Sequence, residues 1–434
     1  MSHAAEMSAD TALPPAPATF RPRNFTALWA GAAATNLADG IFKLTLPLLA
    51  VSLTSSPALV AGASLANTLP WLALALPAGA FADRVDRRRL MMVTTAVRVV
   101  LIALLVAAVL ADALPLIGLY LAALLLGTNE VFADTTRMSV IQMVVPRHRT
   151  ESAFAKLTGT ETVANELAGP PLGGLLAGIG FALALGVSGL GYALTVVALA
   201  VMTGQFRSSR STGATARPSV LSDIRGGLTY VWHERILRLL LLSAGGASAC
   251  WAGWMAIIVV FAVAPGRLGL SESGFGLLMG ALGVGGVLGA FAAPVLSRRL
   301  GRRVVLVGSM ACFTVLIGTP AVSDTPVVIA LATFVGGAGS GAWNVAYSSL
   351  RTLVVPDEMI GRYSGVSRLS SWGSMPLGAA AAGALAEFIS VRAVFWVGGT
   401  MTAALVMLVL WTVSSPDFRE IEARAETSVH PATA

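Results

Sequence analysis

Three polar side chains recur at helical spacing inside the first long apolar segment of the sequence. Asn36, Asp39 and Lys43 stand at positions i, i+3 and i+7 of residues 25–51, so a helix places them on one face. Asp39 and Lys43 are four residues apart, a spacing at which opposite charges on a helix can pair. The pattern has two interpretations: a structural ion pair, or a protonation site whose carboxyl group faces a cavity.

A second group of charges lies in residues 114–138. Glu130, Asp134 and Arg137 share one helical face there. Two carboxylates four residues apart interact strongly, so we expect Glu130 and Asp134 to titrate as a unit. Glu130 lies one turn deeper in the segment than Asp134, and this position favours it over Asp134 for proton exchange. We expect Asp39 to be the proton-coupling carboxylate, with Glu130 as the reserve candidate.

The next apolar segment, residues 155–178, holds Glu161 and Glu166. An ideal helix turns residues five apart by about 140° from each other, so we expect that the two do not line one cavity. The structural alternative for either glutamate is a hydrogen bond between helices. The residues that we predict for proton exchange are Asp39, Lys43, Glu130, Glu161 and Glu166.

The composition indicates that these charges lie within a membrane protein. The chain has 434 residues, of which 56% are hydrophobic and 12% charged, and its mean hydropathy is +0.77. So few charges cannot cover a soluble fold of this size. The net charge of +7 is scattered over short loops, which argues against a nucleic-acid partner. We find no nucleophile–base pair, clustered metal ligands or nucleotide loop, and we expect no metal or cofactor.

A membrane-spanning helix needs roughly 20 apolar residues, and the sequence predicts an all-α membrane protein with about twelve such helices. The polar, basic segment 204–236, part of which we expect to be an amphipathic helix, separates six spans from six. The predicted spans are 25–51, 57–82, 90–110, 114–138, 155–178, 181–203, 237–263, 272–296, 303–322, 326–350, 364–388 and 391–413. The predicted organisation is a disordered tail (1–24), an N-terminal half (25–203), a central loop (204–236), a C-terminal half (237–413) and a second tail (414–434).

The distribution of basic residues predicts the orientation. With the N-terminus in the cytoplasm, 25 of the 29 lysines and arginines fall in cytoplasmic segments, as the positive-inside rule requires. The remaining four are Lys43 and Arg98, within spans, and Arg267 and Arg392, in outer loops. We therefore expect both termini to face the cytoplasm.

The two sets of six spans carry matching landmarks. The string GAFA occurs at 79–82 and at 289–292, and VVP occurs at 144–146 and at 354–356, both at an offset of 210 positions. A common offset at the same topological place predicts duplicated, pseudo-symmetric six-helix halves.

Two motifs resemble those of the major facilitator superfamily. Residues 79–89, GAFADRVDRRR, resemble the loop motif G-x-x-x-D-R-x-G-R-R, with Asp86 in place of the second glycine. AGPPLGG, residues 168–174, is similar to the antiporter motif of the fifth span. The branch that the chain resembles is that of drug:proton antiporters, including macrolide efflux pumps and the enterobactin exporter. An arginine that other such branches carry in the fourth span is absent before Gly127. The matching residues are Gly79, Asp83, Arg84, Arg87 and Arg88 in the loop, and Gly169, Pro170, Gly173 and Gly174 in the fifth span.

The resemblance implies a role for the charged loop in gating. In this superfamily the loop aspartate, here Asp83, caps the N-terminus of a helix in the other half, where free N–H groups and the helix dipole attract a carboxylate. The resemblance also implies that the loop arginines pair with an acid at the inner end of span 4, here Asp134. Such a latch holds the inner gate shut while the outer side is open. The alternative is that these charges only anchor the loop inside the cell.

The repeat also predicts a division of labour between the halves. At the offset of 210, the charged positions of span 4 correspond to uncharged ones in span 10, and every acid of the second half lies outside the middle of its spans. We therefore expect proton chemistry in the first half and substrate contact mainly in the second. Aromatic and thioether side chains suit bulky, partly apolar ligands, although the same residues also serve in packing. The predicted cavity residues are Asn36, Trp251, Trp254, Ser340, Trp343, Asn344, Tyr347, Trp372 and Met375.

These observations predict a monomeric, proton-coupled secondary transporter in the bacterial inner membrane. It exports a bulky, partly apolar small molecule such as a drug, antibiotic or siderophore by alternating access. The partners are then the small-molecule substrate, protons and the lipid bilayer. Import of a nutrient or siderophore is the first alternative, because a fold does not determine direction, and a membrane-embedded sensor or enzyme is the second.

Overall fold

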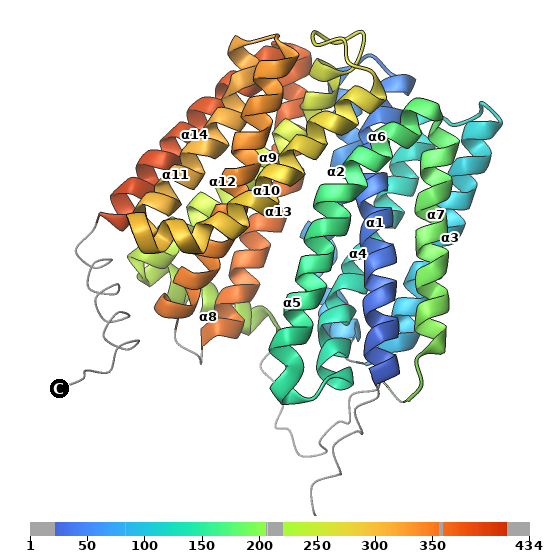
Figure 1. The fold of residues 1–434 in the computed structure, drawn as a ribbon, viewed down its shortest axis with the longest axis horizontal. Coiled ribbons are helices and arrows are strands. Elements are labelled where there is room, and N and C mark those ends of the chain that lie inside the picture. Colours follow the sequence, from blue (N-terminus) through green and yellow to red (C-terminus); the bar gives the residue numbers. More distant parts are fainter. Residues whose placement is uncertain (1–21, 83, 205, 207–219, 356–358, 415–434) are drawn as a thin grey trace, which may run out of the picture.

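The computed structural model describes residues 22–82, 84–204, 206, 220–355 and 359–414, and the regular elements within these ranges are helices (Figure 1). The helices of the first part are α1 (Pro22–Leu53), α2 (Pro57–Ala82), α3 (Arg87–Leu110), α4 (Leu116–Val144), the 3₁₀ turn η1 (Arg147–Arg149), α5 (Thr150–Glu161), the π-helical turn η2 (Thr162–Ala168), α6 (Gly169–Ile179) and α7 (Phe181–Val201). The later helices are α8 (Val220–His233), α9 (Arg235–Ala262), α10 (Glu272–Leu300), α11 (Arg302–Val322), α12 (Pro326–Val354), α13 (Ile360–Phe388) and α14 (Val391–Val413).

Long apolar helices are the expected solution for a chain in lipid, where every backbone N–H and C=O must be paired within the segment. Ten helices among the described residues are long and apolar enough to cross a membrane. The two further predicted spans, 155–178 and 364–388, correspond to the continuous path α5–η2–α6 and to α13. The predicted all-α, multi-pass membrane fold is confirmed.

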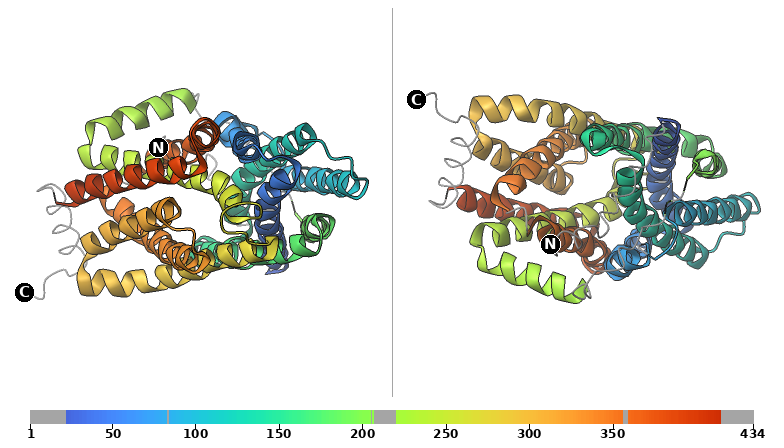
Figure 2. Two further views of the ribbon diagram at one scale, coloured as in Figure 1. Left: turned by 90° about the horizontal axis from the view of Figure 1, so that it is seen from above. Right: turned by 90° about the horizontal axis from the view of Figure 1, so that it is seen from below.

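The helices pack in two sets with the same pairings. In the first set α1 packs on α7, α2 on α4, and α3 on both α4 and α7. In the second set α9 packs on α14, α10 on α12, and α11 on both α12 and α14. We call α1–α7 the N-terminal half and α9–α14 the C-terminal half, and the end views show them side by side (Figure 2). The helix α8 lies outside this repeat and packs on α9 and α13.

The sequence landmarks fall at related places in the two halves. The helices α4 and α12 end at Val144 and Val354, within the two VVP strings and 210 positions apart. The GAFA strings differ more: α2 ends at Ala82, the last residue of its string, whereas α10 continues beyond its own string to Leu300.

The halves are in contact at the end of the molecule where α2 begins and α6 ends. There Ser56 Oγ donates a hydrogen bond to Glu387 of α13 over 2.7 Å, and α6 packs on α10. The α6–α10 contact is close because both helices have glycine at the crossing: a Cβ built on Gly174 would lie 2.5 Å from the Cα of Gly276. The arginine count predicts that this end faces outward.

Candidate functional site

A cavity of about 880 Å³ lies between the two halves, and we call it the central cavity. A cavity of this volume is large enough for a drug-sized molecule. Its wall is formed by α1, α5, η2 and α6 on one side and by α9, α10 and α12 on the other. The N-terminal half contributes charged and amide groups, whereas the C-terminal half contributes aromatic, thioether, hydroxyl and amide groups. Among these lining residues are Lys43, Glu161, Asn165, Glu166, Trp251, Met255, Met279, Ser340 and Asn344.

A smaller cavity of about 360 Å³, which we call the aromatic cavity, adjoins the central cavity. Lys43, Glu166 and Trp251 line both. The rings of Trp343 and Tyr347 stack in its wall with their centroids 5.6 Å apart. The structure thus places seven of the predicted cavity residues along one or both of these two cavities: Trp251, Ser340, Trp343, Asn344, Tyr347, Trp372 and Met375.

The prediction that Trp254 lines the cavity is wrong. Its side chain is 1% exposed and belongs to the main hydrophobic core. Its ring stacks against that of Trp251 with a centroid distance of 5.6 Å. Of these two tryptophans on α9, Trp251 reaches the cavities and Trp254 supports it from behind.

A third cavity, of about 330 Å³, lies mainly within the N-terminal half, and we call it the polar cavity. The ionisable side chains that line it are four carboxyl groups and three guanidinium groups: Asp39, Glu130, Asp134, Glu161, Arg98, Arg137 and Arg368. With all of these groups ionised, the wall has one more negative than positive charge. One bound proton makes the set neutral.

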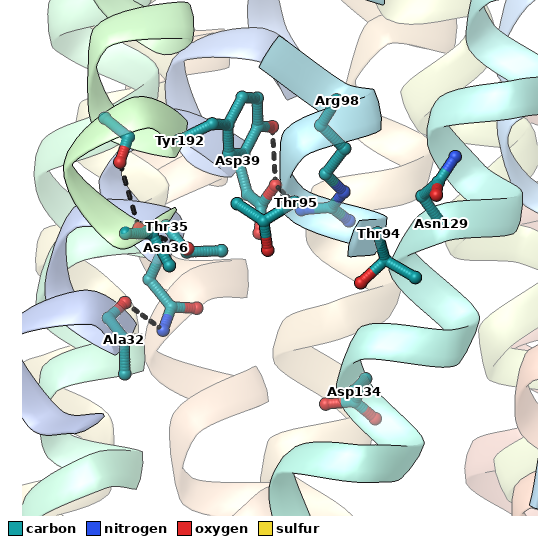
Figure 3. Close-up of polar contacts among 12 residues, drawn as sticks. Ala32, Thr35, Asn36, Asp39, Thr94, Thr95, Arg98, Asn129, Asp134 and Tyr192 are labelled. Carbon is teal, nitrogen blue, oxygen red and sulfur yellow. Dashed lines mark hydrogen bonds and ion pairs between the residues drawn. The ribbon is translucent and has the colours of Figure 1, made fainter. Parts of the chain in front are cut away.

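The carboxylate of Asp39 lies between two donors from other helices (Figure 3). Arg98 of α3 donates from Nη1 to Oδ1 over 2.9 Å, and the hydroxyl group of Tyr192 on α7 donates to the same oxygen over 2.7 Å. The pair of Asp39 with Lys43, which their spacing allows, is not formed, because Asp39 pairs with Arg98 instead. Tertiary packing brings a buried arginine to the carboxylate, while Lys43 lines the central and aromatic cavities instead.

Asn36 also lies elsewhere than predicted. It lines the polar cavity rather than the two cavities shared between the halves. Its side-chain amide donates to the carbonyl oxygen of Ala32, one turn back, over 2.8 Å. The face shared by Asn36 and Asp39 therefore serves the polar cavity.

The prediction that Glu161 and Glu166 cannot line one cavity is also wrong, because both line the central cavity. The reason is η2, the π-helical turn between them. A π turn has i→i+5 hydrogen bonds and is wider than an α turn, so residues five apart face similar directions. Glu161 and Asn165 line both the central and the polar cavity, so this wider turn forms the boundary between the two.

Removing one residue from this turn tests its role. Deletion of Val163, whose side chain is exposed, is expected to restore an α-helical register and rotate Glu161 by about 100° relative to α6. The ion pair of Arg137 with Glu161, 3.3 Å long, is then broken at a cost of about 1.5–3 kcal/mol. We expect transport in proteoliposomes to fall about tenfold or more, because Glu161 then no longer lies at the boundary of the two cavities. The matched Val163→Ala protein keeps the turn and should retain wild-type transport; equal rates in both variants would exclude this role.

Asp134 connects the two halves. One carboxylate oxygen accepts from Arg137 over 2.7 Å, and the other accepts from Arg368 of α13. Arg368 also lies over the ring of Trp71 on α2, 5.1 Å from its centroid. The ring of Trp71 in turn stacks on that of Trp372. Asp134 therefore belongs to a contact between α4 and α13, as a latch requires, but through Arg368.

The predicted pairing of the loop arginines with Asp134 is wrong. Arg88 donates to the carbonyl oxygens of Leu199 and Ala200 at the end of α7, over 2.8 and 2.7 Å. Arg87 donates from Nη1 to the sulfur of Met143, and the side chain of Arg84 is exposed. These contacts fix the loop to its own half.

The other three positions of the loop motif are Asp86, Gly79 and Asp83. Asp86, which replaces the motif glycine, is the N-cap of α3 and accepts from the backbone N–H of Arg89 over 2.8 Å. Gly79 lies near the end of α2, where an added Cβ would meet only the side chain of Thr135 at an ordinary distance. Asp83, the predicted helix cap, lies outside the described residues.

The glycines of the AGPPLGG motif allow close packing of helix backbones. A Cβ built on Gly169 would lie 2.6 Å from the Cα of Gly40, and one on Gly173 would lie 2.8 Å from the carbonyl oxygen of Ile41. Both glycines thus pack α6 against α1. Gly174 packs against α10 of the other half, and Pro170 lines the central cavity.

The contact at Gly174 predicts a conformational effect. The methyl group of Gly174→Ala would meet backbone atoms of α10, which is overpacking at about 1–3 kcal/mol. The conformation in which α6 and α10 touch should then lose population roughly 5- to 150-fold. Spin labels on Ile179 and Leu277, both exposed, should report a longer distance. Gly186→Ala is the control, because nothing lies within 4 Å of its Cβ position. An unchanged distance in Gly174→Ala would contradict the prediction.

Several residues of the site were not identified from the sequence, among them Tyr192, Asn165 and Arg368. Tyr192 lies in an apolar run without a pattern that marks it, and Asn165 is an uncharged residue between the two glutamates of its span. Arg368 was counted among the basic residues that predict orientation, although its place within span 364–388 was a signal of a buried role.

Sequence comparison with known proteins finds a matching family model and similar transporters. The family model described as transmembrane secretion effector matches residues 14–433. A relative named multidrug efflux pump Tap, from Mycolicibacterium fortuitum, is 27% identical over 92% of this chain and 96% of its own. An uncharacterized MFS-type transporter of Sinorhizobium fredii is 26% identical over 88% of this chain and 92% of its own.

Solved structures with low sequence identity share the fold. The nucleoside transporter NupG superposes with a TM-score of 0.71 at 12% identity, over 90% of this chain and 99% of its own. A bacterial homologue of the iron transporter ferroportin, in an inward-facing state, superposes with a TM-score of 0.71 at 15% identity, over 91% and 99%. These likenesses show the arrangement of the helices.

Proposed function

The chain belongs to the transmembrane secretion effector family of the major facilitator superfamily, and from this membership we propose that it is a proton-coupled exporter of bulky, partly apolar small molecules. It is a multi-pass membrane transporter and not an enzyme. The observation that carries the proposal is the central cavity of about 880 Å³ between the two halves. Both halves supply its wall within one chain, so a monomer suffices.

Export is favoured over import by the relatives and by the lining of the cavities. The relatives named multidrug efflux pumps match nearly the whole chain. A wall with Trp251, Met255 and Met279 offers adaptable apolar contacts rather than a fixed set of hydrogen bonds. Such a wall suits several substrates of similar size better than one nutrient.

Proton coupling is supported by the charge balance of the polar cavity. Asp39, Asp134 and Glu161 each form an ion pair with an arginine. Among the described residues, Glu130 has no ion pair or hydrogen bond through its side chain. A group that carries protons must exist in both charge states, and Glu130 can change its charge without breaking such a contact. We therefore propose Glu130 as the proton-binding group.

Alternating access is supported by the two types of contact between the halves. Glycine contacts between α6 and α10 close the molecule at one end, and the ion pair of Arg368 with Asp134 joins α13 to α4 nearer the other. Rocking of the halves about the central cavity requires contacts of this kind to form and break in turn.

The proposed orientation places α8 and both termini in the cytoplasm. The two arginines assigned to outer loops, Arg267 and Arg392, both pair with Asp324, which offsets one of their two positive charges. Alkaline phosphatase inserted between α9 and α10 should be active, whereas the same enzyme fused after α14 should be inactive. The reverse pattern would overturn the orientation.

Everted membrane vesicles test the function directly. An inside-acid pH gradient should drive uptake of at least one of three probes: norfloxacin, erythromycin or ethidium. Nigericin, which dissipates the gradient, should stop it, and vesicles without the protein provide the background. Gradient-driven movement in the opposite sense would establish import, and no gradient-dependent flux of any probe would contradict proton-coupled export.

A further inference from the structure

Two charged side chains in the central cavity are left without an ion pair. Lys43 of α1 and Glu166 of η2 both line the central and the aromatic cavity, and both are exposed there. Among the described residues neither has an ion-pair partner, and they do not pair with each other. In the adjoining polar cavity, by contrast, three of the four carboxyl groups form ion pairs with arginines.

An unpaired lysine at this depth is costly. Lys43 lies within the long apolar helix α1, where a charged side chain is unfavourable unless it meets water or a group of opposite charge. The chain contains only one other lysine, Lys156, so basic residues in this protein are almost entirely arginines. The cost is offset when a bound molecule brings an anionic group to the ammonium group.

Glu166, in the same cavities, favours a cationic group on the ligand. A ligand with only a negative charge meets the carboxylate of Glu166, and one with only a positive charge meets the ammonium group of Lys43. Like charges repel each other, so each of these two ligands loses affinity. A ligand that carries both charges satisfies both side chains.

The C-terminal half provides a surface for the rest of such a ligand. Trp251 lines both cavities and is held by its stack on the buried Trp254. Ser340 and Asn344 lie on the same wall. A flat aromatic ring system can stack on Trp251, while the polar groups of α12 donate to or accept from its substituents.

Building on the proposed export function, we infer that the preferred substrates are zwitterionic aromatic molecules. Lys43 binds the anionic group, Glu166 binds the cationic group, and Trp251 contacts the ring system. This is narrower than the class of bulky, partly apolar molecules, because it excludes simple lipophilic cations as the best ligands.

Three forms of one fluorescent scaffold test the inference. Norfloxacin carries a carboxylate and an ammonium group, its ethyl ester keeps only the ammonium group, and N-acetylnorfloxacin keeps only the carboxylate. Binding to the purified protein in lipid nanodiscs should be tightest for norfloxacin. Each derivative lacks one charge-assisted contact and should bind about tenfold more weakly. A derivative that binds as tightly as norfloxacin, or failure of all three forms to bind, would overturn the inference.

Variants assign the two charges. In Lys43→Met, norfloxacin and its ester should bind equally; in Glu166→Gln, norfloxacin and its N-acetyl form should bind equally. Lys43→Arg keeps the charge and should keep the preference, and Lys156→Met, on the exposed side of α5, is the matched control. An unchanged preference in Lys43→Met would contradict the assignment. The vesicle assay distinguishes this inference from the export proposal. Gradient-driven ethidium uptake together with no charge preference in binding would contradict only the inference. No gradient-driven flux of any probe would contradict proton-coupled export as well.

Discussion

Replacing Glu130 with glutamine is expected to abolish transport driven by a pH gradient while leaving substrate binding and downhill exchange intact. Glutamine preserves the shape of the side chain but cannot exchange a proton at neutral pH. The polar cavity then keeps a fixed charge balance throughout the cycle. Because Glu130 forms no ion pair among the described residues, its replacement leaves no arginine without a partner, and the fold should be unaffected.

The measurement uses everted vesicles with and without an imposed pH gradient. Uptake in Glu130→Gln should fall to the level of vesicles that lack the protein, and counterflow of labelled substrate without a gradient should match the wild type. Glu151→Gln, an exposed position in the first turn of α5, is the control for removal of a glutamate. Persistent gradient-driven uptake in Glu130→Gln would assign the proton to another group.

The sequence was sufficient to predict most of the fold because the bilayer leaves few choices. An apolar run of about 20 residues in lipid must form a helix, and the predicted spans correspond to the helices of the structure. The VVP strings fall at the ends of α4 and α12. A duplicated sequence and a repeated packing pattern therefore agree.

The candidate site was harder to predict, since its contacts join residues far apart in the sequence. Helical spacing puts Asp39 and Lys43 one turn apart on α1, yet the two side chains line different cavities. Spacing alone cannot reveal that α3 brings Arg98 to Asp39 from 59 positions away. The pairing rule for neighbours on one helix gives only a few tenths of a kcal/mol, so a buried arginine readily displaces the local partner.

The π turn is the second reason why prediction from sequence fails locally. The residues Thr162–Ala168 contain no proline or glycine that marks a change of helix type. The direction of every side chain before the turn depends on the type of turn, which is why Glu161 and Glu166 were assigned to different surfaces.

The two tryptophans of α9 show a similar limit. Trp251 and Trp254 are both plausible cavity residues by type, and only the packing of α9 distinguishes them.

Replacing Asp39 with asparagine is expected to destabilise the protein rather than uncouple it. Arg98 is 3% exposed, and its direct ion pair in the structure is with Asp39. Removing one partner of a buried pair costs about 3–5 kcal/mol, because it leaves the other charge uncompensated. We expect lower expression and a clearly lower Tm for Asp39→Asn. Asp112→Asn, at an exposed position after α3, is the control and should behave as the wild type.

The double variant Asp39→Asn with Arg98→Leu distinguishes a structural from a coupling role. It removes both charges, so most of the lost stability should return, since replacement of a buried pair by uncharged residues is often nearly neutral. Tyr192→Phe, which removes only the 2.7 Å hydrogen bond to Asp39, should cost about 1.5–3 kcal/mol. The opposite result is equally informative. If Asp39→Asn is as stable as the wild type and loses only gradient-driven transport, then Asp39 carries the proton and Arg98 must release it during the cycle.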